Sequence, residues 1–263
     1  MSPHLRAVPM PDGKIKGKIL EIEALQKVFP MNGGFLPVLE EITFFAESGE
    51  LICILGRSGC GKSTLLKIVA GFVHPSSGKV IIKGTRVKTP GPDRCIIFQE
   101  DALFPWLTVR ENIAFGLKRR DQKKKSKTAE VERFLELVGL EEFGDYLPSE
   151  ISGGMKQRVA LARVLILKPE VLLMDEPFAS LDAQSREEMQ RLLLTLWREL
   201  AHTILFVTHD VNEAVILADR ILLMSKIPGR IREEIRVNLP RPRERESSAF
   251  MNVSRRLHEA LRD

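Results

Sequence analysis

The sequence predicts an α/β fold with a parallel sheet at its core. Three short apolar runs, at residues 171–174, 204–207 and 221–224, indicate buried strands, and segments of helical periodicity separate them. A fourth apolar run, Leu51–Leu55, precedes a Gly-rich loop and then another segment with helical spacing, at residues 62–70. Strands that alternate with helices in this way are typical of a parallel α/β core.

Further strands are predicted around this loop and helix. Residues 19–29 and 38–45 have the composition of two strands, and the turn Asn32-Gly33-Gly34 separates them. Residues 78–84 form a hairpin-like stretch, and the run Cys95–Phe98 predicts another strand. The first hundred residues are therefore expected to be mostly β-structure around one strand–loop–helix unit.

Length and composition favour a cytoplasmic globular protein. The 263 residues suffice for one large core, or for one core and a small subdomain, and 44% are hydrophobic while 29% are charged. No apolar stretch approaches the roughly 20 residues that cross a bilayer. Residues 1–18 are polar and lack a hydrophobic signal core, so they predict a flexible N-terminal segment. Any role at a membrane is therefore expected to depend on a partner.

The net charge of +5 leaves open an interaction with an anionic partner. Seven of the ten residues Lys118–Lys127 are Lys or Arg. Such a run fits a solvated loop or helix start, and it also fits contact with anionic lipid headgroups. Because the chain has no aromatic interleaving and no recognisable nucleic-acid-binding module, we expect no nucleic-acid partner.

The Gly-rich loop has the full phosphate-binding pattern G-x-x-x-x-G-K-[ST]. Its glycines allow backbone N–H groups to converge on phosphate oxygens, and the helix that starts at Lys62 directs its positive dipole at the same anion. Lys62 is expected to reach the β- and γ-phosphates, and the Ser63 hydroxyl to bind Mg²⁺. The motif thus predicts a nucleoside triphosphate site formed by Gly56, Arg57, Ser58, Gly59, Cys60, Gly61, Lys62, Ser63 and Thr64.

The three cysteines show neither paired nor metal-ligand spacing. Cys53 and Cys95 lie in apolar strand-like runs and are predicted to be buried small hydrophobes. Cys60 lies inside the phosphate loop, where neighbouring positive charge is expected to lower its pKa. Bulky thiol reagents are therefore expected to inhibit ATP turnover.

A block at about residues 100–158 is predicted to be a helical insertion between two halves of the sheet. Thr108 is expected to cap a helix, with Glu111 at the capping-box position. Val131, Phe134 and Val138 then share one apolar helical face that ends near residue 139.

Two carboxylates follow the apolar run at residues 171–174. A buried strand that delivers adjacent carboxylates to its carboxyl end fits a metal site at the edge of a parallel sheet. Asp175 is expected to hold Mg²⁺, directly or through water, and Glu176 to act as general base for water.

Three further elements narrow the class of nucleotide-binding protein. Gln99 follows the strand that ends at Phe98, and Thr208-His209-Asp210 follows the strand at residues 204–207. Ser152-Gly153-Gly154 stands before an evident helix and repeats the anion-binding logic of the first loop.

With these elements, residues 19 to about 240 resemble the ATP-binding subunit of ABC transporters. The resemblance implies a RecA-like P-loop NTPase core with an antiparallel β layer and a helical subdomain at about 100–158. It also implies that two chains form a head-to-tail homodimer around two ATP molecules, with the signature Ser152–Gln157 of one completing the P-loop site of the other. The implied roles are the Q-loop for Gln99, which also lies near Mg²⁺, the D-loop for Ser180-Leu181-Asp182, and the switch histidine for His209.

Two positions depart from the family pattern. The signature has Met155 where glutamine is usual, while its serine and glycines are retained. The aromatic residue that stacks on adenine is commonly Tyr in the family, and here the matching residue is Phe29. Phe29 is expected either to stack on adenine through its ring face or to be a core residue.

The stretch Phe98–Asn112 is similar to importer ATPases of the nitrate, sulfonate and taurine group, as are residues 175–183 and 228–230. This implies an ATP hydrolase on the cytoplasmic face of the bacterial inner membrane, coupled to a permease and, indirectly, to a periplasmic solute-binding protein. An ATPase for another small solute such as an aromatic acid or vitamin precursor, an exporter subunit and a non-transport ABC ATPase are the alternatives. An apolar patch is expected either to receive a permease helix or to pack the helical block; its residues are Leu103, Phe104, Trp106 and Leu107.

The C-terminal part, residues 241–263, is predicted to be a Pro/Arg-rich linker followed by an amphipathic helix. Phe250, Val253, Leu257 and Leu261 share one face of this helix. We expect that face to dock on the chain's own core, with partner or regulatory binding as the alternative.

Overall fold

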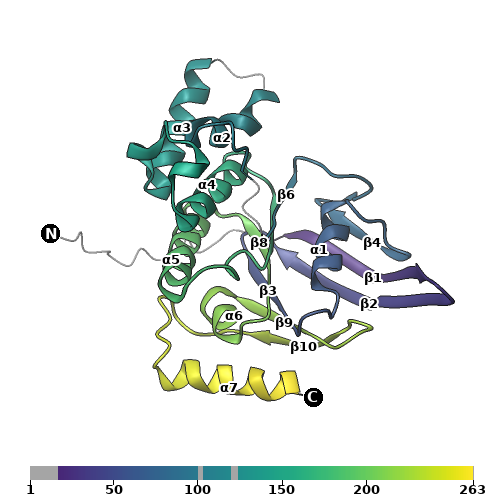
Figure 1. The fold of residues 1–263 in the computed structure, drawn as a ribbon. Coiled ribbons are helices and arrows are strands. Elements are labelled where there is room, and N and C mark those ends of the chain that lie inside the picture. Colours follow the sequence, from purple (N-terminus) through teal and green to yellow (C-terminus); the bar gives the residue numbers. More distant parts are fainter. Residues whose placement is uncertain (1–16, 100–102, 120–123, 263) are drawn as a thin grey trace.

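The computed structural model describes residues 17–99, 103–119 and 124–262, and these residues form two sheets with a helical block at one end (Figure 1). The larger sheet has the strand order β10-β9-β3-β8-β7-β6. All its neighbouring strands run parallel except β10, which is antiparallel to β9. The predicted parallel α/β core is therefore confirmed, with strands β3 (Leu51–Leu55), β6 (Arg94–Ile97), β7 (Val171–Asp175), β8 (Thr203–Thr208), β9 (Arg220–Met224) and β10 (Ile231–Arg236).

The smaller sheet is antiparallel and has the order β2-β1-β4-β5. Its first two strands form a long hairpin that turns where the sequence predicted, and β4 and β5 form the expected second hairpin. The sheet confirms the paired strands predicted near the N-terminus; its members are β1 (Lys18–Met31), β2 (Gly34–Glu47), β4 (Ser77–Ile82) and β5 (Thr85–Arg86).

Alternation along the parallel strands divides the interior into two cores. Ile52, Ile54 and Leu173 face the antiparallel sheet and helix α1 (Lys62–Ala70). Their neighbours Cys53 and Leu172 face the other side, where helices α5 (Ala183–Leu200) and α6 (Val211–Leu217) cover the sheet. Because successive side chains of a strand point to opposite faces, each apolar run contributes to both cores.

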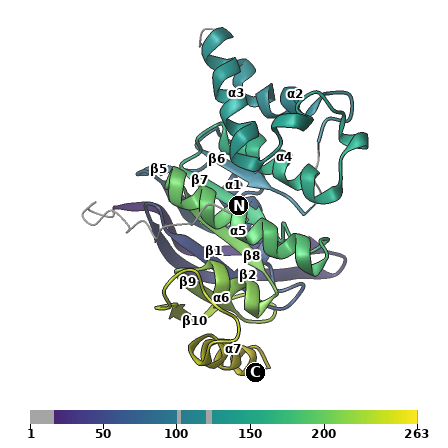
Figure 2. The same ribbon diagram turned by 90° about the vertical axis from the view of Figure 1, so that its left-hand side faces the viewer.

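The helical block lies between β6 and β7, which are neighbours in the sheet, as predicted. It contains α2 (Val109–Ala114), α3 (Lys124–Val138) and α4 (Gly153–Leu165), and short 3₁₀ helices at 115–119, 141–143 and 148–150. Thr108 caps α2 with the predicted capping box to Glu111. The apolar face of α3 is buried, and the block rises above the two sheets (Figures 1 and 2).

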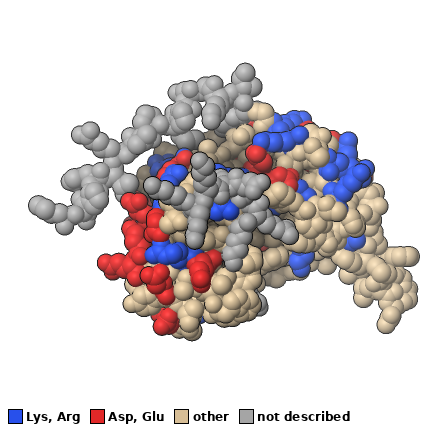
Figure 3. All heavy atoms as spheres, turned by 90° about the horizontal axis from the view of Figure 1, so that it is seen from above, with Lys and Arg blue, Asp and Glu red and all other residues tan. Residues whose placement is uncertain are grey.

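Seen from above, the described surface carries charge of both signs. Acidic side chains gather toward the left of this view and basic side chains toward the upper right (Figure 3). Residues 1–16 of the predicted N-terminal segment, 100–102 of the Gln99 loop and 120–123 of the basic run lie outside the described residues. Among the described residues, no helix is both long and apolar enough to cross a bilayer.

The C-terminal helix α7 (Ser248–Arg262) docks on the chain's own core, as predicted. Phe250 and Leu257 are buried in the core that α6 also enters, and Val253 and Leu261 pack against it. The linker before α7 is anchored by Arg243, whose guanidinium donates to the carbonyls of the last turn of α6 and to Val237. Burial, reinforced by the charge of the adjacent Arg241, lowers the pKa of Arg243 to about 10.

One prediction about the cysteines is only half correct. Cys53 is buried in central strand β3, and burial raises its pKa well above the usual value. Cys95 is half-buried, because β6 is the edge strand of the parallel sheet and has a neighbour on one side only.

Candidate active site

The predicted site residues meet at the carboxyl end of the parallel sheet. The Gly-rich loop follows β3, Asp175 and Glu176 stand at the end of β7, and His209 follows β8. These three strands are neighbours in the order β3-β8-β7, so their carboxyl ends lie along one sheet edge. Ligands of open α/β sheets bind at this edge.

The loop at residues 56–61 is shaped by glycines that admit no side chain. Gly61 has φ of 103°, and a Cβ there would lie 2.8 Å from Leu39 Cδ2 and 3.1 Å from the Val38 carbonyl oxygen. A Cβ on Gly56 would lie 2.8 Å from the Cys60 sulfur. Gly56 and Gly61 therefore leave no room for a side chain, and the loop leads directly into the N-terminus of α1, where backbone N–H groups can face an anion.

Lys62 is the buried cation of this loop, with only 4% of its surface exposed. Its ammonium donates to the carbonyl oxygens of Gly56, at 2.9 Å, and Arg57, at 3.1 Å. It also lies 3.5 Å from Glu176 Oε1. The charge is thus held at the concave side of the loop and faces the acidic end of β7.

Ser63, in the first turn of α1, contacts Asp175 at the end of β7. The Ser63 hydroxyl donates to Asp175 Oδ1 at 2.9 Å. Burial raises the pKa of Asp175, and the hydrogen bond from Ser63 opposes that shift. A hydroxyl and a carboxylate are hard oxygen ligands, so the pair fits Mg²⁺, which is usually held by one or two protein oxygens beside substrate phosphates. Gln99 lies exposed at the end of β6, the strand next to β7.

Glu176 and His209 form the most direct contact in the site. The Nδ1 atom of His209 lies 2.7 Å from Glu176 Oε2. Glu176 has φ of 47°, a left-handed conformation that is unfavourable for a residue with a side chain, and its N–H donates to the Val207 carbonyl at 3.1 Å. Backbone strain of this kind is concentrated at functional sites, where the surrounding structure holds it in place.

Arg186 belongs to the same region and was not predicted from the sequence. Its guanidinium donates to the carbonyls of Phe178 and Leu181, at 3.3 and 2.9 Å, and lies 3.9 Å from Asp210 Oδ2. It also lines a cavity of about 50 Å³ together with Glu176. Arg186 has no sequence signal because its partners come from two separate loops that only the fold brings together.

Ser152 and Asp182, the residues predicted to belong to the signature and the D-loop, are N-caps of helices. Ser152 caps α4 by accepting a hydrogen bond from the Met155 N–H. Asp182 caps α5, where the Ser185 hydroxyl donates to its carboxylate at 2.6 Å and lowers its pKa. The hydrogen bonds of both caps thus remain at their own helices. A Cβ on Gly153 would meet no atom within 4 Å, so the start of α4 is open.

Phe29 occupies a position that accommodates both predicted roles. It lies in β1 opposite Leu36, is half-buried, and packs at the margin of the core between the sheets. The Lys27 ammonium lies 4.6 Å from the centroid of its ring. Stacking on adenine therefore stays a prediction.

The expectation that positive charge lowers the pKa of Cys60 is wrong, whereas inhibition by bulky thiol reagents stays a prediction. Only 2% of its surface is exposed, and burial raises its pKa although the charge of Lys62 acts in the opposite direction. Its sulfur faces inward, next to Gly56, instead of toward the anion side of the loop. Burial outweighs the nearby positive charge because removing a thiolate from water costs more than one screened cation returns.

A phosphate-binding loop at a helix N-terminus, facing two carboxylates at the end of a parallel strand of the same sheet, is typical of P-loop nucleoside triphosphatases. The family model described as ABC transporter matches residues 39–179, and the chain belongs to this family of ATP-binding proteins. It binds ATP and is an ATPase of the ABC class.

Two relatives and one solved structure are similar along most of the chain. The nitrate import ATP-binding protein of Synechocystis is 45% identical over 236 residues, which are 90% of this chain and 89% of the relative. The aliphatic sulfonates import ATP-binding protein of Bacillus cereus is 45% identical over 238 residues, 90% and 94% of the two chains. A dimeric ATP-binding cassette in a post-hydrolysis state with ADP and Pi has a TM-score of 0.72 at 28% identity, covering 84% of this chain and all of its own.

Proposed function

We propose that this chain is the ATP-hydrolysing subunit of an importer that takes up a small anionic solute, such as a sulfonate, taurine or nitrate. The observation that supports the ATPase assignment is the position of Glu176 at the sheet edge. Its carboxylate lies 3.5 Å from the Lys62 ammonium and 2.7 Å from His209 Nδ1. The import part rests on the two relatives, which are named for import of nitrate and of aliphatic sulfonates. Both are similar to this chain beyond the ATPase motifs, over about nine tenths of its length.

The proposed reaction is in-line attack of water on the γ-phosphate of ATP. Lys62 binds the phosphates, and Ser63 and Asp175, with Gln99 nearby, would hold Mg²⁺, which neutralises phosphate charge when bound. Glu176 accepts the proton of the attacking water, and His209 keeps that carboxylate oriented through its 2.7 Å contact. Phe29 contributes a ring face for adenine.

The second half of each site is proposed to come from another copy of the chain. The N-terminus of α4 at Ser152–Gly154 is an anion-binding element whose hydrogen bonds do not involve its own P-loop. In a head-to-tail homodimer it would face the γ-phosphate held by the partner's P-loop, with Asp182 close to the same junction. We assign residues 19–240 to the ATPase unit, including the helical block at about 100–158, and 241–263 to a C-terminal extension.

Within the predicted patch, the aromatic side chains Phe104 and Trp106 are the proposed docking surface for a helix of the membrane permease, while Leu107 is half-buried. The ring of Phe115 lies 4.3 Å from that of Phe104 and extends this aromatic patch. Trp106 is 72% exposed, and its ring lies 5.7 Å from that of Phe104. Buried Asn112 fixes the loop beneath, because its side chain accepts from the Phe104 N–H and donates to the Leu107 carbonyl. Asn112 thus ties the segment that carries Phe104 and Trp106 to helix α2, and exposed apolar surface can mark an interaction site.

The stretch with Leu103 and Trp106 was predicted either to receive a permease helix or to pack the helical block, and these two side chains differ in this respect. Its side chain packs against the main core, whereas Trp106 faces outward. Docking of the aromatic patch on a permease would place the chain at the cytoplasmic face of the inner membrane. A periplasmic solute-binding protein would act only through that permease.

Replacing the proposed base tests the ATPase assignment. Glu176→Gln is expected to bind ATP with a Kd within about twofold of wild type and to lose about 100-fold or more of its turnover, because the amide cannot accept the proton of water. Because this variant would not hydrolyse its bound ATP, it should accumulate as a dimer when ATP is added, which size-exclusion chromatography would detect. The matched control is Glu170→Gln, a half-exposed carboxylate beside the opposite end of β7 that pairs with Lys83. Wild-type turnover by Glu176→Gln would remove Glu176 as the base.

A further inference from the structure

A buried chain of hydrogen bonds runs from the C-terminal linker to the loop of His209. The Arg245 guanidinium donates to Gln190 Oε1 at 3.1 Å, and Gln190 Nε2 donates to Glu213 Oε1 at 3.2 Å. Gln190 is only 2% exposed and Glu213 only 5%. Three elements are thereby connected, since Gln190 lies on α5, Glu213 on α6 and Arg245 in the linker before α7.

Glu213 lies next to Thr208 and Asp210, the two residues that flank His209 in the chain. Glu213 lines the same small cavity as His209 and Thr208, the residue before it. The Thr208 hydroxyl oxygen accepts from the Asp210 N–H at 3.0 Å, and a hydroxyl can at the same time donate its proton to a neighbouring carboxylate such as that of Glu213. On the other side of the turn, the Glu213 N–H donates to Asp210 Oδ1 at 3.2 Å.

Arg245 decides how the amide of Gln190 is oriented. A guanidinium can only donate, so it selects the carbonyl oxygen of Gln190 and leaves the NH₂ group directed at the Glu213 carboxylate. Without Arg245, a rotated amide would present its oxygen to the carboxylate and leave Glu213 with one donor fewer. Burial already raises the pKa of Glu213, and the hydrogen bonds from Thr208 and Gln190 oppose that shift, so the carboxylate depends on both donors.

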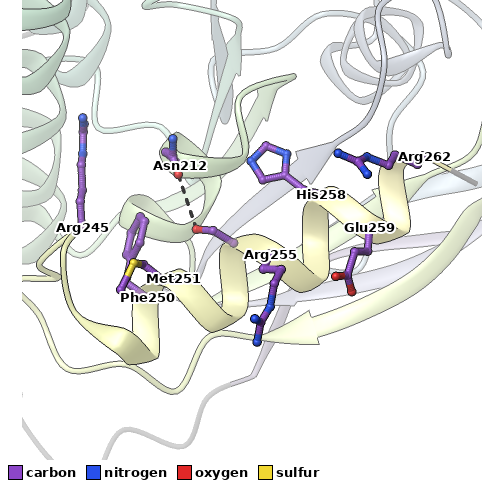
Figure 4. Close-up of a pocket in the computed structure, with 9 residues that line it drawn as sticks. Asn212, Arg245, Phe250, Met251, Arg255, His258, Glu259 and Arg262 are labelled. Atoms are coloured by element: carbon purple, nitrogen blue, oxygen red, sulfur yellow. Dashed lines mark hydrogen bonds between the residues drawn. The ribbon is translucent and has the colours of Figure 1, made fainter.

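The outer end of this chain is exposed to a groove along α7 (Figure 4). The groove has a volume of about 620 Å³, and its lining includes Arg245, Phe250 and Arg255. In the close-up Arg245 extends from the linker away from α7, whereas Asn212 of α6 is joined to Ser254 of α7. Arg255 hydrogen-bonds within its own helix, to Asn252, and so serves as a neighbouring arginine outside the chain of hydrogen bonds.

We infer that Arg245 and Gln190 are positioning residues for His209, acting through Glu213 and Thr208. The C-terminal linker thereby supports the geometry of the His209–Glu176 contact from outside the nucleotide site. The inference rests on the proposed role of His209 in hydrolysis. It also gives the C-terminal extension a function besides packing, because Arg245 reaches a helix 55 residues earlier in the chain.

Steady-state kinetics and NMR of the full chain test this inference. Arg245→Ala and Gln190→Met are each expected to lower kcat for ATP about fivefold while KM changes less than about twofold, because neither side chain contacts the P-loop. The His209 imidazole signal, assigned by its absence in His209→Gln, should shift in both variants. Arg255→Ala should leave both kcat and this signal unchanged, and Arg245→Lys, which keeps a donor, should recover part of kcat.

A double variant separates one connected chain from two independent effects. The double variant Arg245→Ala with Gln190→Met should have about the same kcat as the single variant whose kcat is lower. Two independent fivefold losses would instead multiply to about 25-fold. The inference is overturned if Arg245→Ala has the kcat of Arg255→Ala, if the losses multiply, or if kcat falls while the His209 signal does not move. If the Glu176→Gln test fails but the His209 signal shifts in Arg245→Ala, the hydrolysis mechanism is wrong and the positioning contact stands.

Discussion

The nucleotide edge of the parallel sheet and the start of helix α4 differ in how their polar groups are paired. At the sheet edge, Lys62 and Glu176 contact each other, and Ser63 contacts Asp175, all within one chain. At the start of α4, a Cβ on Gly153 would meet no atom within 4 Å, and the Ser152 hydroxyl accepts a hydrogen bond from the Met155 N–H of its own helix. One region is assembled inside the chain, whereas the other has open space beside it, where we propose that a second copy of the chain contributes its phosphate.

The largest expected effect is the loss of ATP binding when the buried lysine of the nucleotide edge is replaced. Lys62→Ala should weaken ATP binding by about 100-fold or more, because it removes the buried cation that faces the phosphates. Lys83→Ala, an exposed lysine paired with Glu170, should bind ATP as wild type does. The measurement is ATP affinity by isothermal titration calorimetry, and retained affinity in Lys62→Ala would contradict the proposed phosphate contact.

The second expected effect tests whether the start of α4 serves a partner. Gly154→Asp should leave ATP binding and the midpoint of thermal unfolding unchanged, because a Cβ there meets only Ser185 Oγ, at 4.0 Å. Turnover should fall about tenfold to 100-fold, since the new carboxylate would face the partner's γ-phosphate.

Mixing two defective variants sharpens the same comparison. Lys62→Ala supplies an intact α4 start, and Gly154→Asp supplies an intact P-loop, so mixed dimers contain one complete site. ATPase activity of the mixture should exceed the sum of the separate activities. An additive result would mean that each chain hydrolyses ATP by itself.

A third effect concerns the aromatic patch and should leave the nucleotide edge untouched. Trp106→Ala should reduce co-purification with the co-expressed permease by about tenfold, because an exposed aromatic anchor is lost. ATPase activity of the isolated chain should stay within about twofold of wild type. Phe35→Ala, an equally exposed aromatic side chain at the β1–β2 turn, is the control. Equal co-purification of both variants would exclude the patch as the docking surface.

The smallest effect concerns thiol reactivity and has a defined pH dependence. Burial raises the pKa of Cys60, so near neutral pH its thiol is protonated and it should react more slowly with iodoacetamide than half-buried Cys95. Labelling of Cys60 should accelerate as the pH rises, because the thiolate fraction increases. Peptide mass spectrometry of partially labelled protein measures both rates, and faster labelling of Cys60 would contradict its burial.

The local structure around the site was largely predictable from the sequence. The capping box of Thr108 and Glu111, the strand before the P-loop, the helix start at Lys62 and the cap at Ser152 all depend on residues close together in the chain. The environment of Cys60 was mispredicted for the opposite reason. Its neighbours along the chain are polar or glycine, and only the packed loop shows that its sulfur points inward.

The sequence by itself determined the α/β class, the phosphate-binding loop and the carboxylates at the end of β7, because motif spacing and strand periodicity are properties of adjacent residues. Tertiary structure alone decided that Glu176 contacts His209, that Arg186 holds two loops, and that Arg245 reaches Gln190. The physical reason lies in the sheet order β9-β3-β8-β7, which differs from the order of strands along the chain. Residues far apart in sequence become neighbours through that order, and no local spacing encodes it.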